Sequence, residues 1–333
     1  MKNYRLETTD EFPHKPTAEI NFNESVYVNG WDSKKKCGGW MRMGNRVNEG
    51  YTELQLCFYL PDGRIACQFL RPPISSNENF CANGLEYQVI KPFEEVTMKY
   101  AGPLFLLEDP EKLRNPGRFF SESDTVDASI AFRVIGNSPI HGGEPIDENV
   151  QTMYGRDFSF GHFFQHTVTK GTVVIDNKRI TLTGYGWRDH SWGPRYWTNI
   201  FCYRLLIANF GPDHGITLLK LTEENGNVRK SGVLLVDRKY EPIKNLEITT
   251  DWSTNYDPIR IQIEVETEKR SVQMEGEVLV LAPLRNRRKL GDVYLESRIA
   301  EGFTEWKWDE KKGIGITEYI ERIENGRPVG YPQ

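Results

Sequence analysis

Residues 184–195 concentrate side chains capable of acid–base chemistry within a short stretch. They read Gly-Tyr-Gly-Trp-Arg-Asp-His-Ser-Trp-Gly-Pro-Arg, with two arginines, one aspartate, one histidine, one serine and three aromatic residues. The preceding residues 177–183 alternate between apolar and polar types, so the segment is predicted to enter as a β-strand. A purely structural strand has no need of so many polar groups, and we take this stretch as the candidate site.

A strand through this segment divides its side chains between two faces, because successive side chains point in opposite directions. One face carries Tyr185, Trp187, Asp189 and Ser191. The other face carries Arg188, His190 and Trp192. A carboxyl group between aromatic rings is desolvated and favours its protonated form, so Asp189 is predicted to be a proton donor. The alternative is a structural cluster in which Asp189 pairs with the arginines at the end of the strand.

A second strand-like segment, residues 157–168, places two histidines on one face. That face carries Phe160, His162, Phe164 and His166. His162 is a candidate for a catalytic or substrate-orienting role, and two histidines hydrogen-bonded within a polar cluster are the structural alternative. A third interpretation is a metal held by His162, His166 and Asp189, which would also need groups that orient these ligands. The sequence as a whole predicts no metal ion and no other cofactor.

Two further carboxylates are candidates for the acid if Asp189 is not. Asp109 precedes Pro110, a pair typical of the start of a helix, where the aspartate caps the first turn. Asp109 is therefore predicted to be a cap, with a role as a second catalytic acid as the alternative. Glu318, in an alternating segment near the C-terminus, is the next candidate for the acid after Asp109.

The composition of the 333-residue chain argues against several classes of protein. Its net charge of −5 does not indicate the positive surface charge that binds nucleic acid or an anionic membrane. The five cysteines are odd in number and lack CxxC spacing, which disfavours a disulfide framework or a zinc ribbon and favours a reducing cytoplasm. No apolar run reaches about 18 residues, so neither a signal peptide nor a membrane span is expected. The oligomeric state stays open.

Short strands separated by turns recur along the chain. The clearest example is a pair of β-rich runs on either side of Pro61-Asp62-Gly63, which predicts a hairpin that places Leu54 and Leu56 on the same face. No amphipathic helical pattern of ordinary length competes with the strands. Helix content is therefore predicted to be well below the roughly 30–35% of average globular proteins.

The strand pattern predicts an all-β chain of two tandem domains. We place the junction in residues 139–151, which are rich in Pro, Gly and acidic residues and lack strand alternation. The predicted domains are residues 1–145 and 146–333, each a β-barrel or β-sandwich. The chain shows no Gly-rich phosphate loop and no serine nucleophile elbow, which argues against the common nucleotide-binding and hydrolase classes.

The chain resembles the superfamily of carotenoid 1,2-hydratase (CrtC) and AttH-like proteins, which includes CrtC-like terpene cyclases. The run Arg188-Asp189-His190-Ser191-Trp192-Gly193 is the specific part of this resemblance. The other matching pieces are Gly44-Asn45-Arg46, Asn48-Glu49-Gly50, the Pro61-Asp62-Gly63 hairpin, Gly161-His162-Phe163, Pro283-Leu284-Arg285 and Gly313 to Tyr319. Together they span most of the chain. The resemblance implies two lipocalin-like β-domains around an apolar cavity.

The resemblance also implies a reaction in which an aspartate protonates an alkene or an epoxide of an isoprenoid without a cofactor. The hydratase pattern has a His-x-aromatic pair on one strand and an aromatic-x-Asp pair on a later strand. Here His162 with Phe164, and Trp187 with Asp189, stand at those positions. The hydratase pattern differs in having Trp at Phe164, Tyr at Trp187 and Asn at Ser191. The resemblance therefore supports Asp189 as the acid more strongly than it supports any particular product.

These observations together predict a lyase or isomerase that acts on a hydrophobic, isoprenoid-like small molecule, as in secondary metabolism. Protonation of a double bond creates a carbocation, which aromatic faces stabilise. The predicted substrate-binding residues are Trp187, Tyr185, Phe164, Phe160, Ser191 and Trp192. The alternative is a lipocalin-like carrier that binds such a lipid without chemistry, because an aromatic cavity wall looks the same in both. The sequence does not distinguish hydration from cyclisation.

Overall fold

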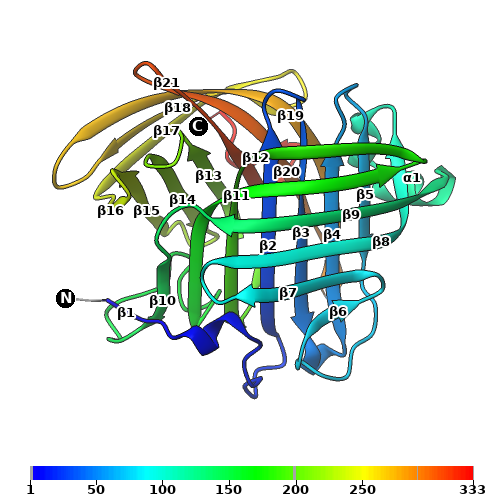
Figure 1. Cartoon of the computed structure of the whole chain (residues 1–333), viewed down its shortest axis with the longest axis horizontal. Helices are drawn as coiled ribbons and strands as arrows, with labels where there is room; N and C mark the ends of the chain where they lie inside the picture. The colour runs from blue at the N-terminus through cyan, green and yellow to red at the C-terminus, as the bar shows by residue number, and fades with distance from the viewer. Residues whose placement is uncertain (1–2, 198–199, 291, 333) are drawn as a thin grey trace. The chain divides into compact units, whose positions relative to one another are not determined.

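The computed structural model describes residues 3–197, 200–290 and 292–332, and nearly all of its elements are strands (Figure 1). Among the described residues, α1 (Pro116–Glu122) is the one α-helix. Three short 3-10 segments accompany it: η1 (Thr8–Glu11), η2 (Val47–Glu49) and η3 (Pro110–Arg114). The predicted all-β class and low helix content are therefore confirmed.

The strands fall into two antiparallel sheets. The first sheet holds β1 (Tyr4–Arg5), β2 (Phe22–Asp32), β3 (Cys37–Arg46), β4 (Tyr51–Tyr59), β5 (Ile65–Leu70), β6 (Phe80–Ala82), β7 (Leu85–Lys91), β8 (Glu95–Leu107), β9 (Thr125–Gly136), β10 (His141–Pro145), β11 (Gly161–Ile175) and β12 (Lys178–Pro194). The second holds β13 (Ile200–Asn209), β14 (Gly215–Glu223), β15 (Val228–Val236), β16 (Lys239–Pro242), β17 (Asn245–Trp252), β18 (Pro258–Glu266), β19 (Ser271–Leu290), β20 (Val293–Trp308) and β21 (Lys311–Glu324), with β22 (Arg327–Pro328) paired to β21.

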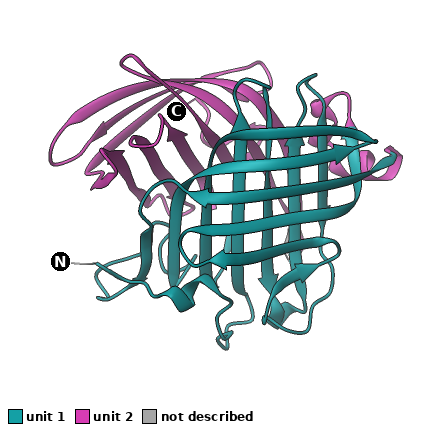
Figure 2. Ribbon diagram, in the orientation of Figure 1, with its two compact units in different colours: residues 1–106, 124–197 teal, residues 107–123, 198–333 magenta. Residues whose placement is uncertain are grey.

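The chain divides into two compact units (Figure 2). Unit 1 comprises residues 1–106 and 124–197, and unit 2 comprises residues 107–123 and 198–333. The predicted junction at residues 139–151 lies inside unit 1, because β10 forms there and pairs with β11. The proposed domain boundary near residue 145 and the division into compact units thus do not coincide.

Unit 1 is built on a closed ring of strands. In order around the ring these are β2, β3, β4, β5, β8, β9, β11 and β12, with β12 paired back to β2. Figure 1 shows β8, β9 and β11 crossing over the layer formed by β2 to β5. A closed ring leaves no unpaired edge among these strands, and the side chains that alternate inward form one apolar core.

The predicted hairpin is part of this ring. β4 and β5 pair from Tyr59↔Ile65 onward, so residues 60–64 form the turn. Leu54 and Leu56 are both fully buried in the core of unit 1, which confirms that they share one face. β8 passes through Pro103 and stays paired with β9 there, with Pro103 opposite Asp127.

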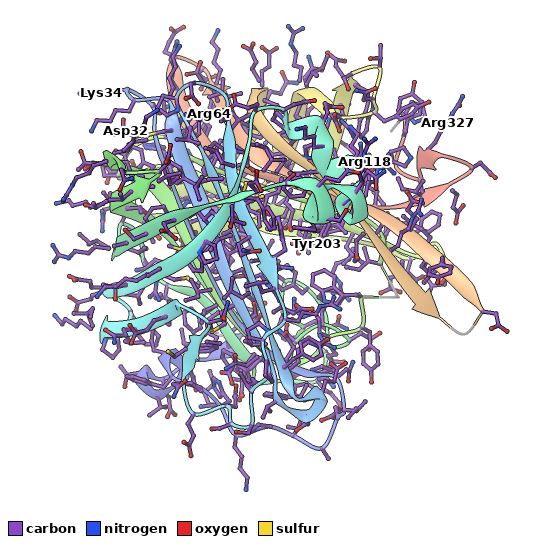
Figure 3. The ribbon with its side chains drawn as sticks, turned by 90° about the vertical axis from the view of Figure 1, so that its right-hand side faces the viewer. Asp32, Lys34, Arg64, Arg118, Tyr203 and Arg327 are labelled. Carbon is purple, nitrogen blue, oxygen red and sulfur yellow. The ribbon has the colours of Figure 1, made fainter. Side chains whose placement is uncertain are left out.

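Charged side chains fix the turns at the end of the barrel where this hairpin lies. Asp32 accepts hydrogen bonds from the backbone N–H of Lys34 and of Lys35, each at 3.0 Å, in the β2–β3 turn. Its other oxygen accepts from the backbone N–H of Thr183 at 3.0 Å, which ties this turn to β12. Figure 3 shows Asp32, Lys34 and Arg64 at the same end of the strands. Arg64 pairs with Asp62 in the hairpin turn at 2.8 Å. These are Asx-type turns, in which a short carboxylate replaces a backbone acceptor.

Unit 2 is an open antiparallel sheet with its own apolar core. The sheet order is β16-β15-β14-β13-β21-β20-β19-β18-β17. Two buried arginines, Arg204 and Arg298, share the buried carboxylate of Glu321 within it. All five cysteines of the chain are free in the structure. Among the described residues, no helix has the length and apolar character needed to cross a membrane.

Candidate active site

Asp189 lies in the middle of a polar triplet on unit 1. It sits on β12 between Phe164 of β11 and Tyr27 of β2, its direct partners across the sheet. Its Oδ2 atom is 3.1 Å from Nε2 of His162 and accepts a hydrogen bond from the hydroxyl of Tyr154 at 3.2 Å. The side chain of Asp189 is 10% exposed and that of His162 is 1% exposed. The two groups are therefore close enough to share or transfer a proton while largely shielded from water.

The glycines of the motif allow β12 to lie close to β2. A Cβ atom on Gly184 would lie 1.7 Å from the carbonyl oxygen of Trp31, and one on Gly186 would lie 2.1 Å from that of Asn29. The side-chain oxygen of Asn29 in turn accepts a hydrogen bond from the backbone N–H of Trp187 at 2.9 Å. The Gly-x-Gly spacing thus positions the strand that carries Asp189.

The residues on either side of Asp189 lie on the opposite face of β12, as the alternation predicts. Arg188 pairs directly with Val28 and His190 with Val26, and both valines belong to the apolar core of unit 1. Arg188 and His190 therefore point into the barrel, and Asp189 points outward. The predicted separation of Asp189 from Arg188 and His190 is thus observed, and the expectation that Asp189 lines an apolar cavity stays a prediction.

The outer face around Asp189 is lined by a continuous row of rings, which we call the aromatic band. Its members are Tyr154, His162, Phe164, Trp187, Tyr27, Trp40 and Phe69. The ring centroids of neighbours along the band lie 4.4 Å apart for Tyr154 and His162 and 5.6 Å apart for Phe164 and Trp187. Such separations are those of interacting aromatic pairs. The predicted residues Phe164 and Trp187 thus lie on the same face as Asp189, with Phe164 directly opposite it.

A buried arginine adds positive charge near one end of the aromatic band. Arg195 donates a hydrogen bond to the hydroxyl of Ser191 at 2.8 Å. Its guanidinium carbon lies 4.9 Å from the ring centre of Phe158 and 6.0 Å from that of Tyr154. Ser191 therefore contributes by holding Arg195. Cation–π contacts also connect residues 154–158 with the end of β12.

Other predicted site residues lie elsewhere. Trp192 is on the inward face, where its ring stacks on His14 at 3.9 Å, so it is not next to Asp189. Phe160 precedes β11 and is 38% exposed. Tyr185 is half-buried on the outer face and pairs with Trp31. Tyr185 is thus on the same face of β12 as Asp189, whereas Trp192 is on the opposite face and Phe160 lies before β11.

The alternative acids have other structural settings. Asp109 is exposed and accepts a hydrogen bond from the backbone N–H of Glu111 at 3.0 Å, which caps η3 as the sequence predicts. Glu318 is a half-buried residue of β21, paired with Glu301 and Leu205. Asp109 and Glu318 both belong to unit 2. A catalytic role for Asp109 stays a prediction.

The metal site considered from the sequence does not form. His162 meets Asp189, but the backbone of His166 bonds to Ser138 and its side chain is fully buried. Among the described residues, the group of three ligand atoms close enough to hold a metal ion consists of different residues, His14, Glu24 and His190.

Tyr154 and Tyr27 lie beside Asp189 and were not predicted from the sequence. The position of Tyr27 depends on strand pairing and that of Tyr154 on a loop, and neither leaves a local sequence pattern.

His141, next to the aromatic band, should make the stability of unit 1 sensitive to acid. Its ring lies 5.2 Å from that of Phe164, and burial first, then the charge of His162, lowers its pKa from 6.5 to about 4. The unfolded chain takes up this proton near pH 6.5 and the folded chain only near pH 4. The free energy of unfolding is therefore expected to fall by about 1–2 kcal/mol as the pH is lowered through this interval, allowing for partial exposure.

Urea denaturation of wild type and of His141→Gln across that interval measures this effect. The variant should lose part of the pH dependence. Equal pH dependence in both proteins would show that His141 is not the responsible group.

Comparisons with known proteins agree with this fold. Residues 7–323 match the model of a family described as a domain of unknown function (DUF7064). No curated protein matches the chain. The structure is similar to the crystal structure of an AttH-like protein from Nitrosomonas europaea, with 12% sequence identity, a TM-score of 0.64 and coverage of 97% of this chain and 99% of that one.

Two further solved structures share the fold. CghA is 10% identical, with a TM-score of 0.56 and coverage of 96% of this chain and 94% of that one. Kievitone hydratase from Nectria haematococca is 7% identical, with a TM-score of 0.53 and coverage of 96% and 97%. The predicted resemblance to the CrtC and AttH-like superfamily is thereby confirmed at the level of the fold. Because the family model spans almost the whole chain, this protein belongs to the DUF7064 family, with the all-β, lipocalin-like fold of AttH-like proteins.

Proposed function

We propose that this protein is an enzyme that protonates an alkene or an epoxide of a lipophilic, isoprenoid-like substrate, with Asp189 as the acid. The observation that carries the proposal is the triplet of Asp189, His162 and Tyr154 at the edge of the aromatic band. Hydrocarbon chemistry through a carbocation needs a shielded proton donor and polarisable surfaces near it. Both stand on the same face of unit 1.

The hydrogen bonds suggest which oxygen of Asp189 carries the proton. Oδ2 accepts from Tyr154 and lies within hydrogen-bonding distance of Nε2 of His162. If Nε2 of His162 is protonated, Oδ2 accepts two hydrogen bonds, one from His162 and one from Tyr154. The transferable proton of Asp189 would then be on Oδ1. Tyr154 and His162 would then stabilise the carboxylate that forms when the proton leaves.

The reaction balances without a cofactor. The π electrons of the alkene form a C–H bond with the proton of Asp189, and the adjacent carbon becomes a cation. In a hydration, the oxygen of water adds to this carbon and the excess proton returns to the Asp189 carboxylate. In a cyclisation, a second alkene of the substrate adds instead, and loss of a proton from the product restores the acid. Ring faces of Trp187 and Phe164 would stabilise the cation by about 0.5–2 kcal/mol each.

A carrier that binds a lipid without chemistry is the second candidate. The aromatic band alone would serve such a carrier equally well. The triplet favours the enzyme, because a largely buried carboxylate bonded to histidine and tyrosine adds nothing to the binding of an apolar ligand and costs desolvation. The shared fold with proteins named kievitone hydratase and CghA is consistent with either candidate at this level of identity.

The discriminating experiment is an assay in deuterated water. The protein is incubated with a panel of alkene-bearing lipophilic compounds that begins with kievitone and includes linear polyprenyl compounds, and the products are followed by mass spectrometry. An enzyme of the proposed kind gives a product with the mass of one added water, or an isomer of the substrate, with deuterium on a former alkene carbon. Ligand binding without conversion for every compound bound would favour the carrier.

Tyr154→Phe tests the triplet. The variant removes the hydroxyl that bonds Oδ2 of Asp189 and keeps the ring in the aromatic band. We expect turnover to fall about two- to tenfold, the equivalent of one hydrogen bond of about 0.5–1.5 kcal/mol, with KM little changed. Tyr185→Phe is the matched control, since Tyr185 is on the same face without a bond to Asp189. Equal losses in both variants would speak against the triplet.

A further inference from the structure

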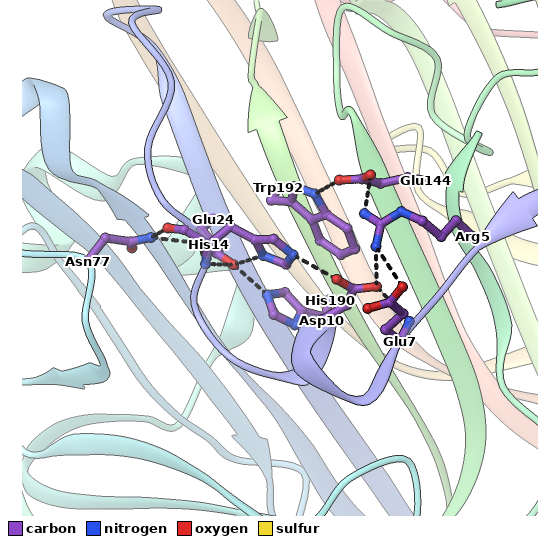
Figure 4. Close-up of polar contacts among 9 residues, drawn as sticks. All are labelled: Arg5, Glu7, Asp10, His14, Glu24, Asn77, Glu144, His190 and Trp192. Atoms are coloured by element: carbon purple, nitrogen blue, oxygen red, sulfur yellow. Dashed lines mark hydrogen bonds and ion pairs between the residues drawn. The ribbon is translucent and has the colours of Figure 1, made fainter. Parts of the chain in front are cut away.

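Three potential metal ligands converge on the inner face of unit 1 (Figure 4). Glu24 of β2 places its Oε1 atom 2.7 Å from Nδ1 of His14 and 2.9 Å from Nε2 of His190. One ligand atom from each of the three residues lies within 4.8 Å of the others. His14 comes from the segment before β2, and His190 comes from β12. Three separate parts of the chain therefore meet at one carboxylate.

The site is buried and preorganised. The side chains of Glu24 and His190 are 0% exposed, and that of His14 is 20% exposed. Oε2 of Glu24 accepts hydrogen bonds from the side-chain amide of Asn77 at 2.6 Å and from the backbone N–H of His14 at 2.8 Å. These bonds fix the carboxylate so that Oε1 faces both imidazoles. A site with little freedom to rearrange binds a metal with less loss of entropy.

The orientation of His14 is supported from outside the cluster. Its second ring nitrogen, Nε2, lies 3.4 Å from Oδ1 of Asp10, and Asp10 itself accepts from the backbone N–H of Glu7 at 2.8 Å. The ring also stacks on Trp192 at an interplanar angle of 14°. A histidine that ligates a metal through one nitrogen and turns the other towards a carboxylate is the usual arrangement around zinc.

The local charge is strongly negative. The residues joined in this network include four carboxylates and one arginine, namely Glu7, Asp10, Glu24, Glu144 and Arg5. With neutral histidines their sum is −4 + 1 = −3, and a divalent cation would bring it to −1. Asp10 and Glu24 are the buried members, with side chains 6% and 0% exposed, and buried carboxylates are costly without a compensating cation.

We propose that His14, Glu24 and His190 form a zinc site that fastens the N-terminal segment to β2 and β12. Two histidines and one glutamate are a known ligand set for Zn²⁺, at bond lengths of about 2.0–2.2 Å. At a tetrahedral angle these bonds separate the ligand atoms by about 3.3 Å, so the imidazoles would move about 0.5 Å from Glu24. His14 can make this movement because residues 13–17 lie outside helices and strands. Coordination through Nδ1 leaves the proton of His14 on Nε2, facing Asp10.

The zinc site is independent of the proposed chemistry. His190 and Asp189 lie on opposite faces of β12, as their sheet partners Val26 and Tyr27 do. The metal would hold the chain together and would take no part in protonation of the substrate. Failure of either proposal therefore leaves the other standing.

Metal analysis of the full chain, free of any affinity tag, tests the proposal. The protein is stripped with a chelator, dialysed, and titrated with Zn²⁺ against a chromophoric chelator. We expect about one equivalent of zinc per chain, a melting temperature that rises with zinc, and loss of tight binding in His14→Ala. His14 is partly exposed and outside regular structure, so this variant is expected to fold; circular dichroism checks it. His214→Ala, a partly exposed histidine of unit 2, is the matched control and should bind zinc like wild type.

Asp10→Asn provides a graded test. It leaves all three ligands in place and weakens the partner of His14, so zinc affinity should fall about 10–100-fold, the range for such outer partners. Wild-type protein that takes up no zinc would overturn the proposal and leave a hydrogen-bonded network of Glu24 with two histidines. A folded His14→Ala protein that binds zinc as tightly as wild type would overturn it as well, by placing the metal elsewhere.

Discussion

Asp189→Asn is expected to lower turnover by about 10²–10⁴-fold, the range for loss of a general acid or base. Asparagine keeps the shape of the side chain and its contacts with His162 and Tyr154, but it has no proton acidic enough to give to an alkene. Substrate binding should survive, because the aromatic band supplies most of the apolar contact. Product formation at saturating substrate, measured together with ligand binding, tests both statements.

Thermal melting serves as the control for this variant. Asparagine keeps the shape of Asp189 and its contacts with His162 and Tyr154, so Asp189→Asn should melt close to wild type. An Asn variant that is folded, binds substrate and turns over at the wild-type rate would remove Asp189 as the acid. The carrier function would then be the better account of the aromatic band.

Arg188→Ala, one residue away, is expected to act on stability instead, with a loss of about 3–5 kcal/mol. Arg188 is 3% exposed and forms a two-pronged ion pair with Glu11, at 2.7 and 3.1 Å, in the interior of unit 1. It also donates to the side chain of Gln165 at 3.0 Å. Its removal leaves the fully buried Glu11 carboxylate without a counter-charge. Chemical denaturation of the variant measures the loss.

Two comparisons separate the buried charge from other causes. The double variant Arg188→Met with Glu11→Met removes both charges and should recover much of the loss, because apolar groups of similar size often replace a buried ion pair without cost. Arg64→Ala breaks a more exposed pair with Asp62 and should cost less than about 1 kcal/mol. A loss for Arg188→Ala no larger than for Arg64→Ala would contradict the ion pair as the main contribution.

The contrast between these neighbours follows from local sequence, which is why it could be predicted. Alternation along residues 185–192 assigns each side chain to a face before any partner is known. The Pro61-Asp62-Gly63 hairpin and the Asp109 cap were predictable for the same reason, since each depends on a few adjacent residues. Local patterns of this kind also sufficed for the all-β class.

Features that depend on distant pairing were not predictable. Tyr27 lies opposite Asp189 although many residues separate them in the chain, and nothing near Tyr27 in the sequence signals that register. Alternation separates Asp189 from Arg188 and His190, but a strand pattern does not show which of the two faces the ring of strands encloses. Residues 139–151 were predicted to be the domain junction because they lack strand alternation, whereas pairing with β11 makes part of them a strand. Tyr154 reaches Asp189 from a loop, which has no periodicity to read.

The discontinuous unit 2 has a consequence for how the protein is made. Residues 107–123 belong to unit 2, yet residues 124–197 of unit 1 follow them before the rest of unit 2 is synthesised. η3 and α1 pack on β19, so they leave the ribosome long before their partner exists. The ring of unit 1 also stays open until β11 and β12 have been translated. The nascent chain must therefore keep the open strand edges of unit 1 from pairing wrongly until Pro194 has emerged, and residues 107–123 must wait for β19 long after that ring has closed.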